Sequence, residues 1–453
     1  MRASNNIPAD IQYQMVMASN REMANELRAH LQASQSNHPN VLKLEDLCIG
    51  PDGRVRAVME VAAGGDVQKL HRILGALSDL DVLPQTARAA VERDMAAQML
   101  LGIAAMHGAG VVHHDLKGEN VFLKADGTVQ IADFGSGIAM TAQGKTPKVT
   151  REIGHTLAYA PSSPKAEHDE AFDIFTVGKI LERDLGTLGK PGSTASSADR
   201  LRQALTRSDA DKRADLKAAA KTAYIAEVND FRNMPEYKDL LKEVMAAQST
   251  AVGKFVKARF RLVHSLDICC CDALGPAMEP INLLASDAKY AELNDISIEI
   301  RKMTDDYYKA VIQEIKPLSA KDFSGTVAEP EEKAQWWVVV LRQENRKLDR
   351  VLLQHRDLMR QFVSKYQEVL RSVDWVAMGS KLTDKQKQQA IDGLAKAEMR
   401  VYGVLDAFDE VAPRIAELVQ AIGALVQAKS GELQTIREAG RKFMLAQARR
   451  TGS

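Results

Sequence analysis

The sequence predicts an α+β domain that is followed by an all-α region. Strand-like and helical segments alternate in the first part of the chain, and nearly every segment after about residue 200 has helical periodicity. The length of 453 residues is also too great for one compact domain. We therefore expect one domain over residues 1–250 and a helical bundle or coiled-coil module over residues 251–453.

Composition narrows the classes of partner. The chain is 45% hydrophobic and 26% charged, with 60 basic and 60 acidic residues. This balance does not indicate that the chain as a whole binds nucleic acid or an anionic membrane. The longest strongly apolar run, WWVVVL at residues 336–341, is far shorter than the roughly 20 residues that span a bilayer. We expect no nucleic-acid partner and no membrane span.

Cysteine usage and the first residues bear on location. Cys48 stands alone and residues 269–271 are three adjacent cysteines, which is neither a zinc spacing nor a disulfide framework. A reducing compartment is therefore expected. The triple is interpreted as a buried helical turn, with a lipidation site as the alternative. The first 15 residues are polar and lack a signal-peptide core, so we expect the protein in the cytoplasm, or in a host cell as a secreted effector.

The first domain is expected to open with a helix and a pair of strands. Residues 20–34 have a helical pattern of apolar side chains. Residues 41–49 and 54–61 are typical of strands, and the Pro-Asp-Gly sequence at 51–53 predicts the turn between them.

A long helix, a hairpin and a second helix are expected next. Apolar residues at helical spacing predict a helix over residues 86–107, which Gly108 and Gly110 end. Residues 121–135, VFLKADGTVQIADFG, predict a hairpin with an Asp-Gly turn. Residues 171–185 again have a helical pattern.

The region after residue 250 is expected to be helical, with an interruption at 319–332. Between residues 348 and 373, apolar side chains recur at steps of three and four, which is the stripe of a helix buried in its own domain or of a coiled coil that binds a partner. This stripe consists of Leu348, Leu352, Met359, Phe362, Tyr366, Val369 and Val373.

The segment VVHHDLKGENVFL, residues 111–123, places polar groups between two apolar runs. Phosphoryl transfer needs a carboxylate that orients the attacking hydroxyl, a cation near the transferred group and oxygen ligands for Mg²⁺. Asp115 could orient the hydroxyl, Lys117 could neutralise charge on the phosphate, and Asn120 could bind the metal. The hairpin that follows would return Asp133 to the side of Asn120, where the two could hold Mg²⁺ together.

These motifs resemble those of the eukaryotic-type serine/threonine protein kinases. HHDLKGEN followed by DFG is similar to the catalytic and metal-binding loops of that family, and MEVAAGGD to the hinge between its lobes. LLGIAAMH, GHTLAYAPS and FDIFTVGKIL follow in the family's order. The resemblance implies a protein-kinase-like bilobal fold, a bacterial member of the family, and transfer of the γ-phosphate of ATP, with Mg²⁺, to Ser/Thr hydroxyls of a protein substrate.

The resemblance assigns roles at the reacting centre. Asp115 matches the catalytic base and Lys117 the lysine typical of serine/threonine kinases. Asn120 and Asp133 match the metal ligands. Thr156 would brace Asp115 and Lys117.

The resemblance also assigns a nucleotide site. Met59 falls at the gatekeeper position, and the backbone of Glu60 and Ala62 would meet the adenine edge. Asp66 would reach the ribose. Phe122 would lie under the adenine ring.

Four further residues match supporting positions of the family. Asp173 would hold the catalytic loop from below, and His113 would support that loop. Glu26 matches the helix glutamate that pairs with an ATP-positioning lysine. His114 stands where the family usually has an arginine that pairs with a phosphorylated activation loop. This exchange resembles the kinases that do not need loop phosphorylation.

The sequence departs from the family at its beginning. No glycine precedes Gly50 and no lysine precedes Lys43, so the glycine-rich loop and the strand lysine are missing. Ser162 replaces the last glutamate of the activation segment. The chain is therefore interpreted as a truncated copy of a longer active kinase, or as a kinase with a reduced N-lobe. The alternative function is a pseudokinase scaffold that binds a protein partner through its C-terminal helices.

Overall fold

A computed structural model of the chain forms two compact units. The first consists of Met1–Gln248 together with Glu432–Ser453, and the second of Ser249–Gly431. The structure describes residues 23–49, 55–139, 156, 158–161, 170–183, 197–208, 216, 219, 221–270, 413–425 and 431–451, with single positions between 298 and 428.

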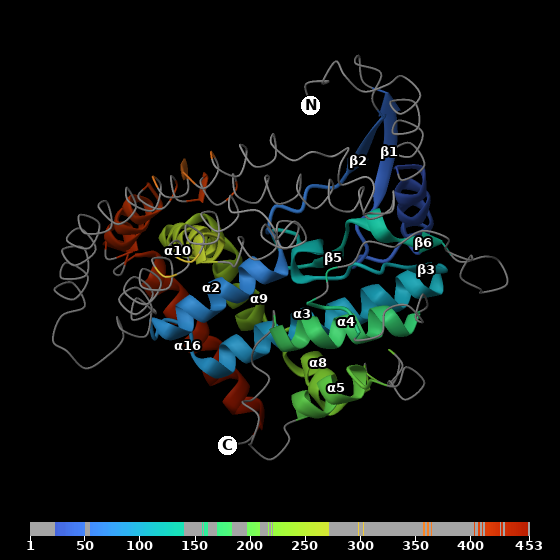
Figure 1. The fold of residues 1–453 in the computed structure, drawn as a ribbon. Helices are drawn as coiled ribbons and strands as arrows, with labels where there is room; N and C mark the ends of the chain where they lie inside the picture. The colour runs from blue at the N-terminus through green and yellow to red at the C-terminus, as the bar shows by residue number, and fades with distance from the viewer. Residues whose placement is uncertain are drawn as a thin grey trace. The chain divides into compact units, whose positions relative to one another are not determined.

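The first unit opens with a helix over residues 23–34 and an antiparallel pair of strands, β1 (Leu44–Ile49) and β2 (Val55–Met59). The expected helix and both strands are thus confirmed (Figure 1). The turn at 51–53 lies outside the described residues.

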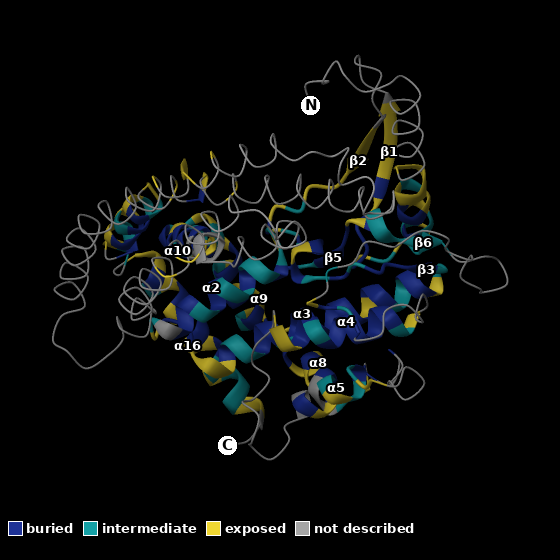
Figure 2. Ribbon diagram, viewed as in Figure 1, coloured by how far each residue is buried: buried dark blue, intermediate teal, exposed yellow. Residues whose placement is uncertain are grey.

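Two helices follow the strands. Helix α2 (Val67–Asp79) begins at Asp66, whose carboxylate accepts a hydrogen bond from the Lys69 amide at 2.7 Å and so caps the helix. This helix was not predicted. Helix α3 (Gln85–Gly108) confirms the long helix expected over 86–107. Most of α3 is buried, as its dark blue colour in Figure 2 shows, so it forms the centre of the unit's core.

Two short pairs of strands lie against this core. β3 (Val111–Val112) pairs with β6 (Ile138–Ala139), and β4 (Val121–Leu123) pairs antiparallel with β5 (Val129–Ile131). The β4–β5 pair confirms the expected hairpin. Gly127 in its turn has a φ of +82°, a conformation that glycine adopts without a steric penalty.

Helices complete the first unit. Helix α4 (Glu170–Arg183) confirms the helix expected over 171–185 and contacts α3. The helices that follow are α5 (Ser197–Leu205), α7 (Ala223–Ala226), α8 (Val228–Phe231) and α9 (Pro235–Ala246), and after α9 the 3₁₀ turn η5 (Ala247–Ser249).

The last helix of the chain, α16 (Glu432–Thr451), packs against α9 and α3 of the first unit. Phe443 is fully buried there, with its ring 5.5 Å from that of Tyr237 and 5.9 Å from that of Phe231. The expected helical module of residues 251–453 therefore differs from the structure in its last helix. The physical reason is that the apolar face of α16 is buried on α9.

The second unit is described mainly by α10 (Ala251–Cys270) and by a helix over residues 413–425. Arg261 of α10 forms an ion pair of 3.5 Å with Glu417 of the other helix. The interruption at 319–332 and all seven residues of the stripe at 348–373 lie outside the described residues, so the helical bundle stays a prediction.

Candidate active site

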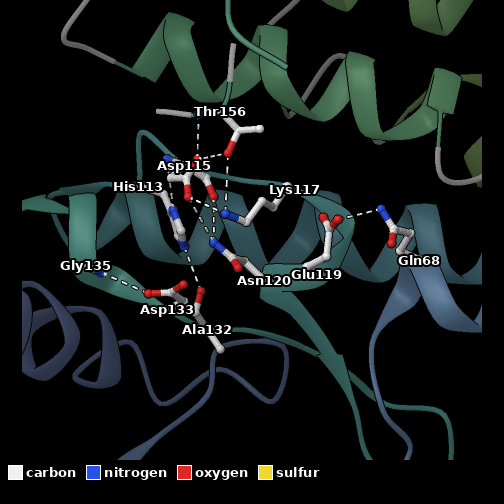
Figure 3. A network of polar contacts seen from close by, with 10 residues as sticks. All are labelled: Gln68, His113, Asp115, Lys117, Glu119, Asn120, Ala132, Asp133, Gly135 and Thr156. Carbon is white, nitrogen blue, oxygen red and sulfur yellow. Dashed lines mark hydrogen bonds and ion pairs between the residues drawn. The ribbon is translucent and has the colours of Figure 1, made fainter. Parts of the chain in front are cut away.

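Asp115 is the centre of a polar network in the loop between β3 and β4. Its Oδ1 accepts hydrogen bonds from the amide and the hydroxyl of Thr156, at 2.9 and 2.8 Å. Its Oδ2 accepts one from Lys117 Nζ at 2.8 Å, and Lys117 also reaches the Thr156 hydroxyl at 3.4 Å (Figure 3). The structure thus brings together three residues that the sequence analysis singled out.

Asn120 belongs to the same network. It ends the 3₁₀ turn η1 (Gly118–Asn120), which brings it back toward Asp115. Its amide nitrogen donates to the Asp115 carbonyl at 2.9 Å. The side-chain oxygen of Asn120 is therefore the atom that remains for a metal ligand.

Asp133 lies close to this turn because the β4–β5 hairpin folds back. The amide of Ala132, the preceding residue, donates to the Asn120 carbonyl at 3.0 Å. Asp133 has a left-handed backbone with φ of 61°, and its side chain accepts from the Gly135 amide at 3.4 Å. A non-glycine residue in this conformation is uncommon and is typical of functional loops.

Lys117 stays positively charged in this setting. Partial burial alone would lower the pKa of Lys117, but its hydrogen bond to Asp115 and the charges of Asp115, Asp133 and Glu119 raise the pKa above its usual range. The site therefore presents a fixed cation among carboxylates.

Asp173 of α4 holds the loop from below. Its carboxylate is fully buried and accepts hydrogen bonds from the amides of His113 and His114, at 2.7 and 2.9 Å, and from the His107 ring at 2.9 Å. Burial alone would raise the pKa of Asp173, but the hydrogen bond from His107 and the nearby histidines lower it. The carboxylate stays ionised and fixes the loop that carries Asp115.

Three rings in contact connect the loop to the helix over residues 23–34. The Phe134 ring lies 4.7 Å from that of His30 and 5.2 Å from that of His113, measured between centroids. His113 also bonds the Ala132 carbonyl through Nε2 at 2.8 Å, and His30 bonds the Leu42 carbonyl at 2.8 Å. The helix, the loop and the segment after Asp133 therefore form one connected structure.

The expected nucleotide segment runs from the end of β2 to the start of α2. Hydrogen bonds join it to β4, from the Gly64 amide to the Leu123 carbonyl at 2.7 Å and from the Leu123 amide to the Gly65 carbonyl at 2.8 Å. A β-bridge then sets Asp66 opposite Phe122. Two of the residues assigned to a nucleotide site are thus neighbours.

The other three residues assigned to the nucleotide lie along the same segment. Met59 ends β2 and is partly exposed, and Ala62 is half-buried. The Glu60 side chain forms an ion pair with Lys124 at 2.7 Å, which lowers the pKa of Glu60.

Comparison with known proteins bears on the identity of this site. A family model described as "Protein kinase domain" matches residues 11–250, more than half of the chain. The chain belongs to the protein kinase family. This membership carries the kinase-like bilobal fold, so that part of the predicted fold is confirmed.

Individual relatives agree with the family model. The serine/threonine-protein kinase PknL of Mycobacterium tuberculosis is 38% identical over 165 residues, which are 36% of this chain and 37% of that kinase. The serine/threonine-protein kinase chk1 of Schizosaccharomyces pombe is 30% identical over 162 residues, 36% of this chain and 30% of that kinase. The serine/threonine-protein kinase pkn3 of Myxococcus xanthus is 30% identical over 174 residues, 37% and 30% of the two chains. The chain spans about a third of the length of these curated relatives.

The surroundings of Glu26 differ from those expected for the helix glutamate of the family. Partial burial raises the pKa of Glu26, and the charge of Asp133 raises it further. Within the described part of the chain, Asp133 is the charged group that shifts Glu26, and no lysine takes part. The expected glutamate is thus present beside Asp133, while its lysine partner is not seen there.

The two residues expected to bind a metal, Asn120 and Asp133, would fit Mg²⁺ only together with other oxygen ligands. Among the described residues, no group of three or more His, Cys, Asp and Glu side chains is arranged so that it could hold a metal ion. Asn120 and Asp133 offer two oxygen ligands, and Mg²⁺ usually completes its shell with water and substrate phosphates. In the same described residues, no helix is both long and apolar enough to cross a membrane.

His114 packs against helix α4. It is buried, its backbone has a left-handed φ of 65°, and its ring lies 5.2 Å from that of Phe172. Its side chain therefore lies in the core beside Phe172.

Sequence reasoning missed several residues near the site. Gln68 donates to Glu119 at 2.6 Å beside the catalytic loop, as Figure 3 shows. His30 joins the ring stack, and Gln248 bonds the carbonyl of Gly64. Of these residues, only Glu119 could be linked to the site from the sequence, because it lies within the motif HHDLKGEN. The contacts of the others join segments that are far apart in the sequence.

Proposed function

We propose that this kinase transfers the γ-phosphate of ATP to Ser/Thr hydroxyls of a protein substrate, with Mg²⁺. The network of Asp115, Lys117, Thr156 and Asn120 carries the proposal, because it joins an orienting carboxylate, a cation and a metal ligand within hydrogen-bond distance. The names of the relatives, which are serine/threonine-protein kinases, support the choice of hydroxyl.

Each residue of the network has a distinct task. Asp115 accepts a hydrogen bond from the substrate hydroxyl and orients it for attack. Lys117 places its charge where negative charge develops on the transferred phosphoryl group. Asn120 and Asp133 would hold Mg²⁺, which when bound supplies electrostatic stabilisation of the phosphates.

The nucleotide itself would lie along the segment after β2. The backbone of Glu60 and Ala62 would bond the adenine edge behind Met59, and Phe122 would form the apolar surface below the ring. Asp66 already caps α2, and burial raises its pKa. One carboxylate oxygen of Asp66 bonds the Lys69 amide, and the other would reach the ribose.

The test is transfer of labelled phosphate from ATP to a generic protein substrate. We expect Asp115→Asn and Asp133→Asn to reduce transfer about 10²- to 10⁴-fold, as losses of groups that serve the transition state do. Asp126→Asn is the matched control, because Asp126 is exposed in the β4–β5 turn and bonds only the Thr128 amide among the described residues. Equal transfer by wild type and by Asp133→Asn would contradict the proposal.

A second candidate function is a pseudokinase scaffold that binds a protein partner through the second unit. It is favoured by Glu26, which faces Asp133 without a lysine among the described residues. The scaffold predicts no phosphate transfer with Mg²⁺ or Mn²⁺. A Mg²⁺-dependent rise in melting temperature with ATP separates intact nucleotide binding from its loss.

A further inference from the structure

Gln248 contacts the expected nucleotide segment, from which it is far apart in the sequence. It lies in η5, directly after α9, and its Nε2 donates a hydrogen bond to the Gly64 carbonyl. The side chain is partly buried, and Nε2 also lies 3.9 Å from Met245 Sδ. This contact spans 184 residues of sequence, so no local pattern predicts it.

The two glycines that Gln248 covers have no room for a side chain. A Cβ on Gly65 would lie 2.6 Å from Gln248 Oε1, and Gly65 has a φ of +74°. A Cβ on Gly64 would lie 2.8 Å from the Leu123 carbonyl oxygen. The turn is thus enclosed between β4 on one side and η5 on the other.

This enclosed turn connects the two parts of the expected nucleotide site. Ala62 precedes it by two residues, and Asp66 follows it directly. A displacement of Gly64 and Gly65 would therefore move the adenine-binding backbone relative to the residue assigned to the ribose. Apart from the β4 backbone, Gln248 is the described group that bonds this turn.

We propose that Gln248 is a positioning residue for the nucleotide: its hydrogen bond to Gly64 sets the spacing between the adenine-binding backbone and Asp66. The inference rests on the proposed function, because it concerns affinity for ATP. Gln248 is also the last residue of the first unit before Ser249 begins the second. The expected nucleotide segment is therefore held by the last residue before the chain enters the second unit.

The test uses the full chain with Gln248→Met, which keeps the length of the side chain but removes the donor. We expect KM for ATP, and Kd for a fluorescent ATP analogue with Mg²⁺, to rise about three- to tenfold, as the loss of one hydrogen bond would produce. We expect kcat and KM for the protein substrate to stay unchanged, because the bond serves ground state and transition state alike.

A matched control separates positioning from folding. Gln434→Met makes the same change on α16, where Gln434 is part of an exposed pair with Glu438 at 3.0 Å. We expect it to leave KM for ATP unchanged. A lower melting temperature in Gln248→Met with an unchanged KM for ATP would reduce Gln248 to a structural contact and overturn the proposal.

Hydrogen exchange without nucleotide distinguishes this inference from the proposed function. In Gln248→Met, the amides of Gly64 and Leu123 should exchange faster, while the Ile131 amide, bonded to the Asn40 carbonyl at 3.0 Å, should not change. If the wild type binds no nucleotide, the proposed function fails, and exchange alone decides whether Gln248 fixes the turn. Unchanged exchange at Gly64 and Leu123 would overturn the inference in either case.

Discussion

A histidine ring stacks on Phe134 where the helix over residues 23–34 meets the site. His30 is almost fully buried, and burial lowers its pKa; the hydrogen bond to the Leu42 carbonyl opposes this shift and the charge of His113 adds to it. The buried ring is therefore neutral at neutral pH, and its protonation would place a cation within the stack.

This position predicts a loss of stability in acid. Because the pKa of His30 is lower in the folded state than the unfolded value of about 6.5, its contribution to stability is present above that pH and is lost as the pH falls through the folded pKa. His30→Phe keeps a stacked ring and removes the titration. We expect its free energy of unfolding to fall less between pH 7.5 and 5.5 than that of the wild type.

Urea unfolding at the two pH values measures this difference. His264→Phe makes the same substitution at an exposed histidine and serves as the control for the substitution itself. Burial lowers the pKa of His38 as well, so part of the acid sensitivity should remain in His30→Phe. The same pH dependence in His30→Phe and wild type would exclude His30 as a source.

At the scale of single residues, the sequence predicted the site best where it is local. Asp115, Lys117 and Asn120 are two to five residues apart, and one 3₁₀ turn brings them together. Asp133 followed from the hairpin. The contact of Gln248 with Gly64 could not be predicted, because it depends on how α9 packs.

Among the described elements, α16 makes the contacts that span the greatest distance in sequence, because it packs on α3 and α9. Phe443 is fully buried against Phe231 and Tyr237, whereas Leu445 of the same helix is 51% exposed. Gly440 lets the helix approach Pro84, since a Cβ there would lie 3.2 Å from the proline ring. The helix therefore covers both the beginning of α3 and one face of α9.

We expect Phe443→Ala to lower the free energy of unfolding of the first unit by about 3–5 kcal/mol, through lost burial and a cavity. Leu445→Ala is the control and should change it by less than about 0.5 kcal/mol. Hydrogen exchange of the α3 amides measures the stability of the first unit. Tryptophan fluorescence does not report on the first unit, because all three tryptophans lie within Ser249–Gly431. They are Trp336, Trp337 and Trp375. Equal protection of α3 in both variants would contradict this role of α16.

The predicted elements agree with the structure where a local pattern defines them. Helices α3 and α4 begin and end within one or two residues of the expected bounds. Helix α2 was missed although Asp66 caps it and apolar residues recur at helical spacing, because the glycines before it were interpreted only as part of the hinge. The helical character of α16 was expected, but the surface that it covers is set by long-range packing, which periodicity does not reveal.

For the molecule as a whole, the second unit is an insertion between η5 and α16. The first unit should therefore fold without Ser249–Gly431, provided that α16 is kept. We expect a chain in which a long flexible linker replaces these residues to melt cooperatively near the temperature of the first unit in the full chain.

A chain that ends at residue 250 is the comparison. Without α16, the side chains of Phe231 and Tyr237 lose the cover of Phe443, and the melting temperature should fall by several degrees, as a loss of a few kcal/mol does in a domain of this size. Thermal melts followed by circular dichroism measure both chains. Equal melting temperatures of the two chains would show that α16 does not stabilise the first unit.

The same insertion sets an order of events during synthesis. Thr86 at the start of α3 meets Met444 of α16, 358 residues later. At about 5–20 residues per second, a ribosome takes on the order of 10–40 s to make Ser249–Gly431. During this time, the apolar surface of α9 that α16 later covers stays exposed in the nascent chain. The first unit can therefore be completed only after the second unit has been synthesised. We expect a chaperone to bind, and misassembly to begin, at this exposed surface.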